Sequence, residues 1–136
     1  MIDKLTEVLV KEEDALKKLL GLLDEQFKLI MSKNVFGMEE MVERLQSCNK
    51  EIAEFEVERR KLIGGKSMRE VVKALDNNVL DNSYRGIQKL LEAITLQKDT
   101  NEALIKQQIG YTNKMLNIIN PRREVKTYNS YGNIRR

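Results

Sequence analysis

The fold is decided by one stretch, Leu80 to Ile119, which reads LDNSYRGIQKLLEAITLQKDTNEALIKQQIGYTNKMLNII. Its apolar residues recur at alternating three- and four-residue steps, which keep one stripe of a helix facing a partner. The stripe consists of Ile87, Leu90, Ile94, Leu104, Tyr111, Met115 and Ile118, with Gln97, Asn101 and Gln108 at polar positions of the same register. At 1.5 Å per residue the helix would be roughly 60 Å long. Such a helix needs partner helices to remain folded.

Two runs in the N-terminal half supply these partners. The first helix is expected over residues 2–31, with Glu12 and Gln26 at polar positions among Ile2, Leu5, Leu9, Leu16, Leu19, Leu23 and Ile30. A turn is expected over residues 32–37, and the second helix should run from Met38 to the Gly64-Gly65 pair. Its stripe is Met38, Met41, Leu45, Cys48, Ile52, Phe55, Arg59 and Leu62. A short connection between two long helices predicts antiparallel neighbours.

Three residues within these stripes are not ordinary apolar residues. Glu12 is interpreted as a carboxylate at a helix interface that reaches solvent or a nearby lysine. Arg59 is expected to reach solvent or a carbonyl at the helix end. Cys48 is interpreted as a buried, inert thiol.

A short third helix is expected next. Ser67 and Glu70 have the spacing of a capping box, in which the serine caps the first turn and the glutamate reaches back. About ten residues should follow, with Met68, Val71, Val72 and Leu75 on the apolar face, before Asp76-Asn77-Asn78 ends the helix. The predicted fold is therefore all-α: an antiparallel bundle of three long helices and one short helix over residues 1–119, followed by a tail over residues 120–136.

Composition agrees with this fold. A chain of 136 residues with 41% hydrophobic residues can form one modest core, and 33% charged residues with a single proline suit long solvated helices. The single cysteine allows no internal disulfide. We find no segment apolar enough to span a bilayer and no signal peptide at the start, so a cytoplasmic location is expected.

Histidine is absent, which removes the usual means of several chemistries. Helical di-iron sites use Glu-x-x-His pairs, so a site of this usual form is excluded. A His/Cys zinc site and a histidine general base are excluded for the same reason. No phosphate-binding loop or dinucleotide fingerprint occurs either. The chain is therefore not expected to be an enzyme, and no catalytic residue, metal site or cofactor is predicted.

The segment after Pro121 differs from the helical part. Five basic residues against one acidic residue give it a charge of +4, which exceeds the +3 of the whole chain. It has no helical period, so disorder is expected. A near-neutral helical body with a basic tail does not favour nucleic-acid binding. Tyr128 and Tyr131 in this tail are either incidental or part of a short docking motif.

The long helix carries a second apolar stripe beside the first: Leu91, Ile105, Ile109, Thr112, Leu116 and Ile119. Two packed partner helices would account for this width. Alternatively, residues 104–119 present apolar surface that the bundle leaves uncovered, as in proteins that bind a partner helix in a groove. The candidate site on this segment consists of Leu104, Ile105, Gln108, Tyr111, Met115, Leu116 and Ile119.

The chain resembles the FlgN family, the flagellar type III export chaperones for hook-filament junction proteins. Three features carry the resemblance: the helical hairpin ending in Glu58-Arg59-Arg60, the segment NEALIKQQI at residues 101–109, and the tail TYNSYGN at residues 127–133. The tail departs from the usual family form, in which a glycine often closely follows the first tyrosine. Either Tyr128 or Tyr131 could therefore correspond to the family position.

The resemblance implies a small cytoplasmic helical chaperone that uses no cofactor. It would bind the amphipathic terminal helices of junction proteins, prevent their premature association and deliver them to the export gate through its tail. It implies no nucleic-acid partner and no stable membrane insertion, and a homodimer is possible. The rival interpretation is a structural, homo-oligomeric coiled-coil protein without a client, since the polar stripe residues suit either function.

Overall fold

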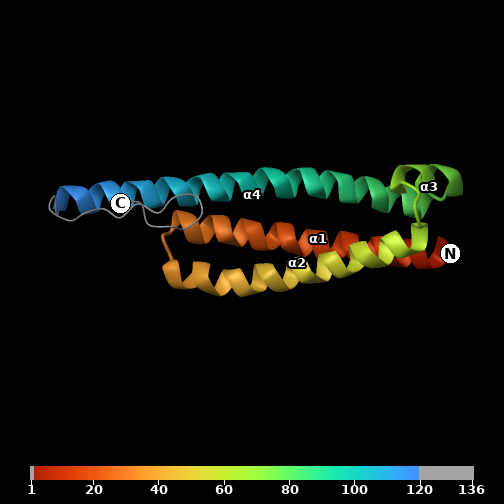
Figure 1. Cartoon of the computed structure of the whole chain (residues 1–136), viewed down its shortest axis with the longest axis horizontal. Coiled ribbons are helices and arrows are strands. Elements are labelled where there is room, and N and C mark those ends of the chain that lie inside the picture. The colour runs from red at the N-terminus through yellow and green to blue at the C-terminus, as the bar shows by residue number, and fades with distance from the viewer. Residues whose placement is uncertain (1, 120–136) are drawn as a thin grey trace. The chain divides into compact units, whose positions relative to one another are not determined.

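The computed structural model describes the backbone of residues 2–119 and the side chains of residues 2–110 (Figure 1). The described residues form four helices: α1 (Ile2–Met31), α2 (Val35–Ile63), α3 (Met68–Leu75) and α4 (Asn78–Ile119). This part of the chain contains no strand, which confirms the all-α prediction. The chain divides into two compact units, Met1–Asn101 and Glu102–Arg136. The expected tail at residues 120–136 lies outside the described residues.

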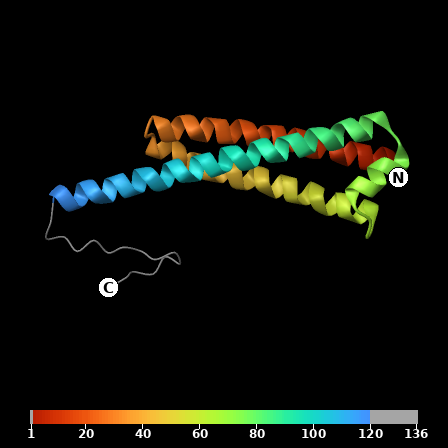
Figure 2. The ribbon, with the colours of Figure 1, turned by 90° about the horizontal axis from the view of Figure 1, so that it is seen from above.

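Helices α1 and α2 form an antiparallel hairpin and lie side by side in both views (Figures 1 and 2). The turn between them is shorter than expected, because α2 begins at Val35 rather than at Met38. Asn34 explains the difference. Its side-chain Oδ1 accepts a hydrogen bond from the Gly37 N–H at 2.9 Å, and its carbonyl accepts one from Met38 N–H at 3.0 Å. This cap starts the helix before the first stripe residue.

The far end of α2 follows the sequence prediction. Gly64 caps the helix with a φ of +62°, a conformation that glycine adopts without the steric cost of a side chain. Ser67 then accepts a hydrogen bond from the Glu70 N–H at 3.2 Å, as its capping role predicts. Helix α3 has 8 residues rather than about ten, since Asp76 adopts the left-handed conformation directly after Leu75.

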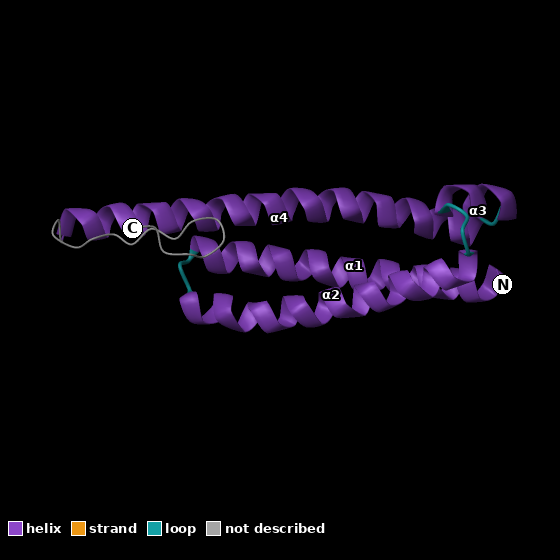
Figure 3. Ribbon diagram, viewed as in Figure 1, coloured by secondary structure: helices purple, strands orange, loops and turns teal. Residues whose placement is uncertain are grey.

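The start of α4 lies within the segment that was expected only to end α3. Asn77 Oδ1 accepts a hydrogen bond from the Leu80 N–H at 3.1 Å, and α4 begins at Asn78 (Figure 3). The 76–78 segment therefore ends one helix and starts the next within three residues. The loops at this end of the hairpin are short.

All four helices contribute to the hydrophobic core of the first unit. Most of its members were predicted from the stripes and from the apolar face of the short helix: Leu5, Leu9, Leu16, Leu19 and Leu23 from α1, Met41, Cys48 and Ile52 from α2, Val71 and Val72 from α3, and Ile87 and Ile94 from α4. Leu80, near the start of α4, also belongs to the core, although no stripe included it. Burying one such side chain contributes roughly 1.5–3 kcal/mol, so this shared core holds the helices together.

None of the described helices is both long enough and apolar enough to cross a membrane.

Candidate functional site

The first unit ends at a buried polar network on α4. Asn101 is almost fully buried, and its Nδ2 donates to the Leu23 carbonyl and to Gln26 Oε1, both at 2.9 Å. Its Oδ1 accepts a hydrogen bond from Gln97 Nε2, also at 2.9 Å. Three of the polar stripe residues therefore meet one another between α1 and α4. A buried amide that loses a hydrogen-bond partner destabilises the fold. This network therefore favours one register of α4 on α1.

The predicted binding residues follow Asn101 directly. Leu104, Ile105 and Gln108 are half-buried. Tyr111, Met115, Leu116 and Ile119 lie on α4, but their side chains are outside the described residues. Ile109 was placed in the second stripe but not in the predicted site. It is 57% exposed and lies one helical turn after Ile105, so it extends the apolar surface of this segment.

The two predicted docking tyrosines, Tyr128 and Tyr131, both lie outside the described residues. Of the predicted client-binding and docking residues, the structure therefore describes the side chains of Leu104, Ile105 and Gln108.

Glu12 and Arg59 have partners that the sequence interpretation missed. Arg59 Nη1 donates to both carboxylate oxygens of Glu12, at 2.7 and 3.0 Å. Glu12 was expected to reach solvent or a lysine, and Arg59 was expected to reach solvent or a helix-end carbonyl. Each side chain instead has the other as its partner. Both residues occupy stripe positions, so the two polar side chains meet in the α1–α2 interface.

The electrostatics of this pair are dominated by burial. Removal of the carboxylate from water raises the pKa of Glu12, while the Arg59 guanidinium opposes that rise and Glu56 adds to it. Among the side chains that the structure describes, Arg59 Nε is a buried polar atom without a hydrogen-bond partner. The loss of hydration offsets much of the attraction between the two charges. We therefore expect this ion pair to specify the register of α1 on α2 more than it stabilises the fold.

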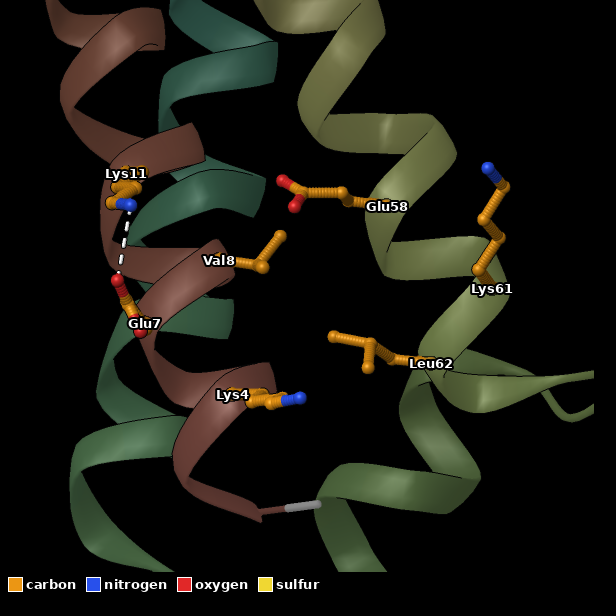
Figure 4. A pocket seen from close by; sticks show the side chains of 7 residues that line it. All are labelled: Lys4, Glu7, Val8, Lys11, Glu58, Lys61 and Leu62. Carbon is orange, nitrogen blue, oxygen red and sulfur yellow. Dashed lines mark ion pairs between the residues drawn. The ribbon is translucent and has the colours of Figure 1, made fainter.

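A groove of about 400 Å³ opens between α1 and α2 one helical turn from this pair (Figure 4). Val8 and Leu62 point into it from opposite helices, and Glu58 reaches toward α1. Lys11 is paired with Glu7 on the rim at 3.0 Å. The sequence interpretation did not predict this groove. Its mixed charges and small apolar floor do not resemble a catalytic centre.

Cys48 is buried, as predicted, and its Sγ lies 3.5 Å from the Ala15 carbonyl oxygen, to which it donates. Burial raises the pKa of this thiol, which favours the unreactive protonated form. Within the described part of the chain, no three acidic or cysteine side chains lie close enough together to hold a metal ion.

Comparison with known proteins adds to this geometry. The model of the FlgN protein family matches residues 1–136, the whole length of the chain. The chain belongs to the FlgN family. No curated protein and no solved structure shows significant similarity to it. FlgN is a chaperone family of flagellar biogenesis and not an enzyme family. The match confirms the resemblance found in the hairpin, the NEALIKQQI segment and the tail.

Proposed function

We propose that this FlgN-family chain is a cytoplasmic export chaperone that binds the helical terminal segments of hook-filament junction proteins. It prevents their premature association and delivers them to the type III export gate. The observation that carries the proposal is the family match over the whole chain. The proposal includes no catalytic step, no cofactor and no nucleic-acid partner.

The client surface in this proposal lies on α4 after Asn101. It comprises Leu104, Ile105, Gln108, Tyr111, Met115, Leu116 and Ile119, to which we add Ile109. The exposed Ile109 supports the proposal, because the free energy falls when a client helix covers a large aliphatic side chain that was in contact with water. Each Å² of apolar surface covered contributes roughly 25 cal/mol before the entropic cost of association is subtracted.

Delivery is assigned to the tail. Tyr128 and Tyr131 would anchor it on the export gate, since an aromatic ring fills a pocket with few rotatable bonds to immobilise. The basic residues around them would mainly speed the encounter with an acidic surface. Neither role involves the first compact unit.

A homo-oligomeric coiled-coil protein without a client is the second candidate. It is favoured by two exposed leucines on α4, Leu91 and Leu96, which a second copy could cover. Light scattering alone separates these functions poorly, because a chaperone can also form dimers.

The deciding experiment is a calorimetric titration of the chain with peptides from the C-terminal helices of candidate junction proteins. Saturable binding is expected for the chaperone, and no binding to any such peptide for the structural protein. A Tyr128→Ala, Tyr131→Ala variant should retain client affinity and thermal stability but lose binding to the cytoplasmic domain of the export gate. Gate binding equal to that of the unmodified chain would refute the tail's role.

A further inference from the structure

The turn between α1 and α2 exposes more apolar surface than a solvated turn requires. We call residues 28–37 the hairpin tip. Phe36 is 83% exposed, Val35 is 59% exposed and Met31 is 57% exposed. These three large side chains lie within six consecutive residues at one end of the hairpin (Figure 1). Scattered exposed apolar residues are ordinary, but a gathered set indicates a contact surface.

The charges of the hairpin tip have one sign. Lys28 and Lys33 are its two charged residues, and no acidic residue occurs between Gln26 and Met38. Helix α2 has no acidic residue in its first turn, where helices usually favour one. On the near side of the tip, Glu25 is paired with Arg44 at 2.9 Å. The first carboxylates beyond the tip are Glu39 and Glu40, on the next turn of α2.

Several backbone N–H groups of the hairpin tip have partners within the protein. The N–H groups of Ser32, Lys33 and Asn34 donate to carbonyls of the last turn of α1, at 3.0, 3.1 and 2.9 Å. Those of Gly37 and Met38 donate to Asn34, at 2.9 and 3.0 Å. These N–H groups lose little when they leave water for a less polar medium, whereas those of Val35 and Phe36, in the first turn of α2, have no partner among these bonds.

We propose that the hairpin tip inserts into the interface of an anionic lipid membrane. Phe36, Val35 and Met31 would enter the boundary between headgroups and acyl chains, while Lys28 and Lys33 remain among the lipid phosphates. A turn with exposed apolar side chains and only basic charges fits such a surface, because a membrane interface accepts apolar side chains without a complementary pocket. Three apolar residues and two lysines give weak, reversible attachment and not a membrane span.

The chain contains no tryptophan, so a Phe36→Trp variant carries a single fluorescent reporter at the tip. Its emission should shift to shorter wavelength with vesicles of phosphatidylglycerol and phosphatidylcholine, and much less with phosphatidylcholine alone. A Leu96→Trp variant is the matched control, since Leu96 is 71% exposed on α4 and far from the turn in sequence. Its emission should not move.

Sedimentation with the same anionic vesicles measures affinity. A Phe36→Ser change should weaken binding by at least about fivefold, whereas Leu96→Ser should leave it unchanged. Circular dichroism should show unchanged helicity in both variants, because both positions are solvent-exposed. Client-peptide affinity should also be unchanged, so a failure here is distinct from a failure of the proposed chaperone function.

Three results would overturn the proposal. One is an unshifted emission at position 36 with vesicle-bound protein, which would assign lipid binding to the basic tail. Another is an equal shift in the Leu96→Trp control. The third is a shift that occurs with the export-gate domain but not with vesicles, which would make the tip a protein contact.

Discussion

Arg59 on α2 pairs with Glu12 on α1 inside the helical hairpin, through one guanidinium nitrogen, Nη1, that donates to both carboxylate oxygens. The Glu12 side chain is 3% exposed and that of Arg59 is 19% exposed. The pair occupies a position where both helices otherwise present apolar side chains. If α1 and α2 were paired one helical turn out of register, the buried Glu12 carboxylate would have no cation beside it. The pair therefore discriminates against other registers of α1 on α2.

Removing one partner should be costly. A Glu12→Ala change leaves the Arg59 guanidinium partly buried without its counterion, and we expect a loss of about 3 kcal/mol in the free energy of unfolding. The double change Glu12→Leu, Arg59→Met restores an apolar layer and should be neutral or stabilising. Urea denaturation of Glu12→Leu, of Arg59→Met and of the double variant measures the coupling. A double variant as unstable as the sum of the singles would show that the pair is not coupled.

Glu12 also gives the fold a pH dependence. Because burial raises its pKa in the native state above the ordinary value of 4.5, the folded chain holds the proton more tightly than the unfolded chain. Stability from this group is therefore fullest below pH 4.5 and falls as the pH rises from there through the native pKa.

A Glu12→Gln variant lacks this titration. The difference in unfolding free energy, unmodified chain minus variant, should therefore decrease as the pH rises above 4.5 and then become constant. Urea midpoints at a series of pH values measure it. A difference that instead increases with pH would show that Arg59, and not burial, dominates the pKa of Glu12.

The helices were largely predictable from sequence, but their partners were not. A three- and four-residue step identifies the buried face of a helix, and the Gly64 and Ser67 signals mark ends by local chemistry. The start of α2 was predicted three residues late because the Asn34 cap, and not the first stripe residue, determines it. The Glu12–Arg59 contact depends on how two antiparallel helices align, which neither stripe contains alone.

The residues of the candidate site stay a prediction. The second stripe already included Ile109, but periodicity cannot separate a face covered by a neighbour from one open to solvent. Exposure, which depends on the packed structure, identifies Ile109 as surface. The hairpin tip was missed for another reason: residues 32–37 were interpreted only as a break in the helical pattern.

Asn101 should contribute to stability through its network and not through its volume. An Asn101→Ala change removes the partners of the Leu23 carbonyl and of the Gln26 and Gln97 side chains. The expected loss is about 1–3 kcal/mol in the free energy of unfolding. Thr100→Ala is the matched control, because Thr100 is exposed and bonds only within its own helix. Thermal or urea unfolding that gives equal losses for the two variants would contradict the role of the network.

Two glycines should respond in opposite directions to alanine. Gly21 lies within α1, and an added Cβ would have nothing within 4 Å, so Gly21→Ala should stabilise the chain by about 1 kcal/mol. Gly64 adopts positive φ at the end of α2, so Gly64→Ala should destabilise it by about 1–2 kcal/mol. Differential scanning calorimetry compares the two melting temperatures with that of the unmodified chain. A fall in the Gly21→Ala variant would contradict its open position.

Peptide titration of point variants tests the proposed client site, the part of α4 that follows Asn101. Ile109→Asp and Ile105→Asp should each raise the Kd for a junction-protein helix peptide about tenfold or more, because a carboxylate then faces the apolar client. Val57→Asp is the control, since Val57 is similarly exposed on α2, and its Kd should not change. Circular dichroism should show full helicity in all three variants. An unchanged Kd for Ile109→Asp and Ile105→Asp with helicity retained would show that the client does not bind this part of α4.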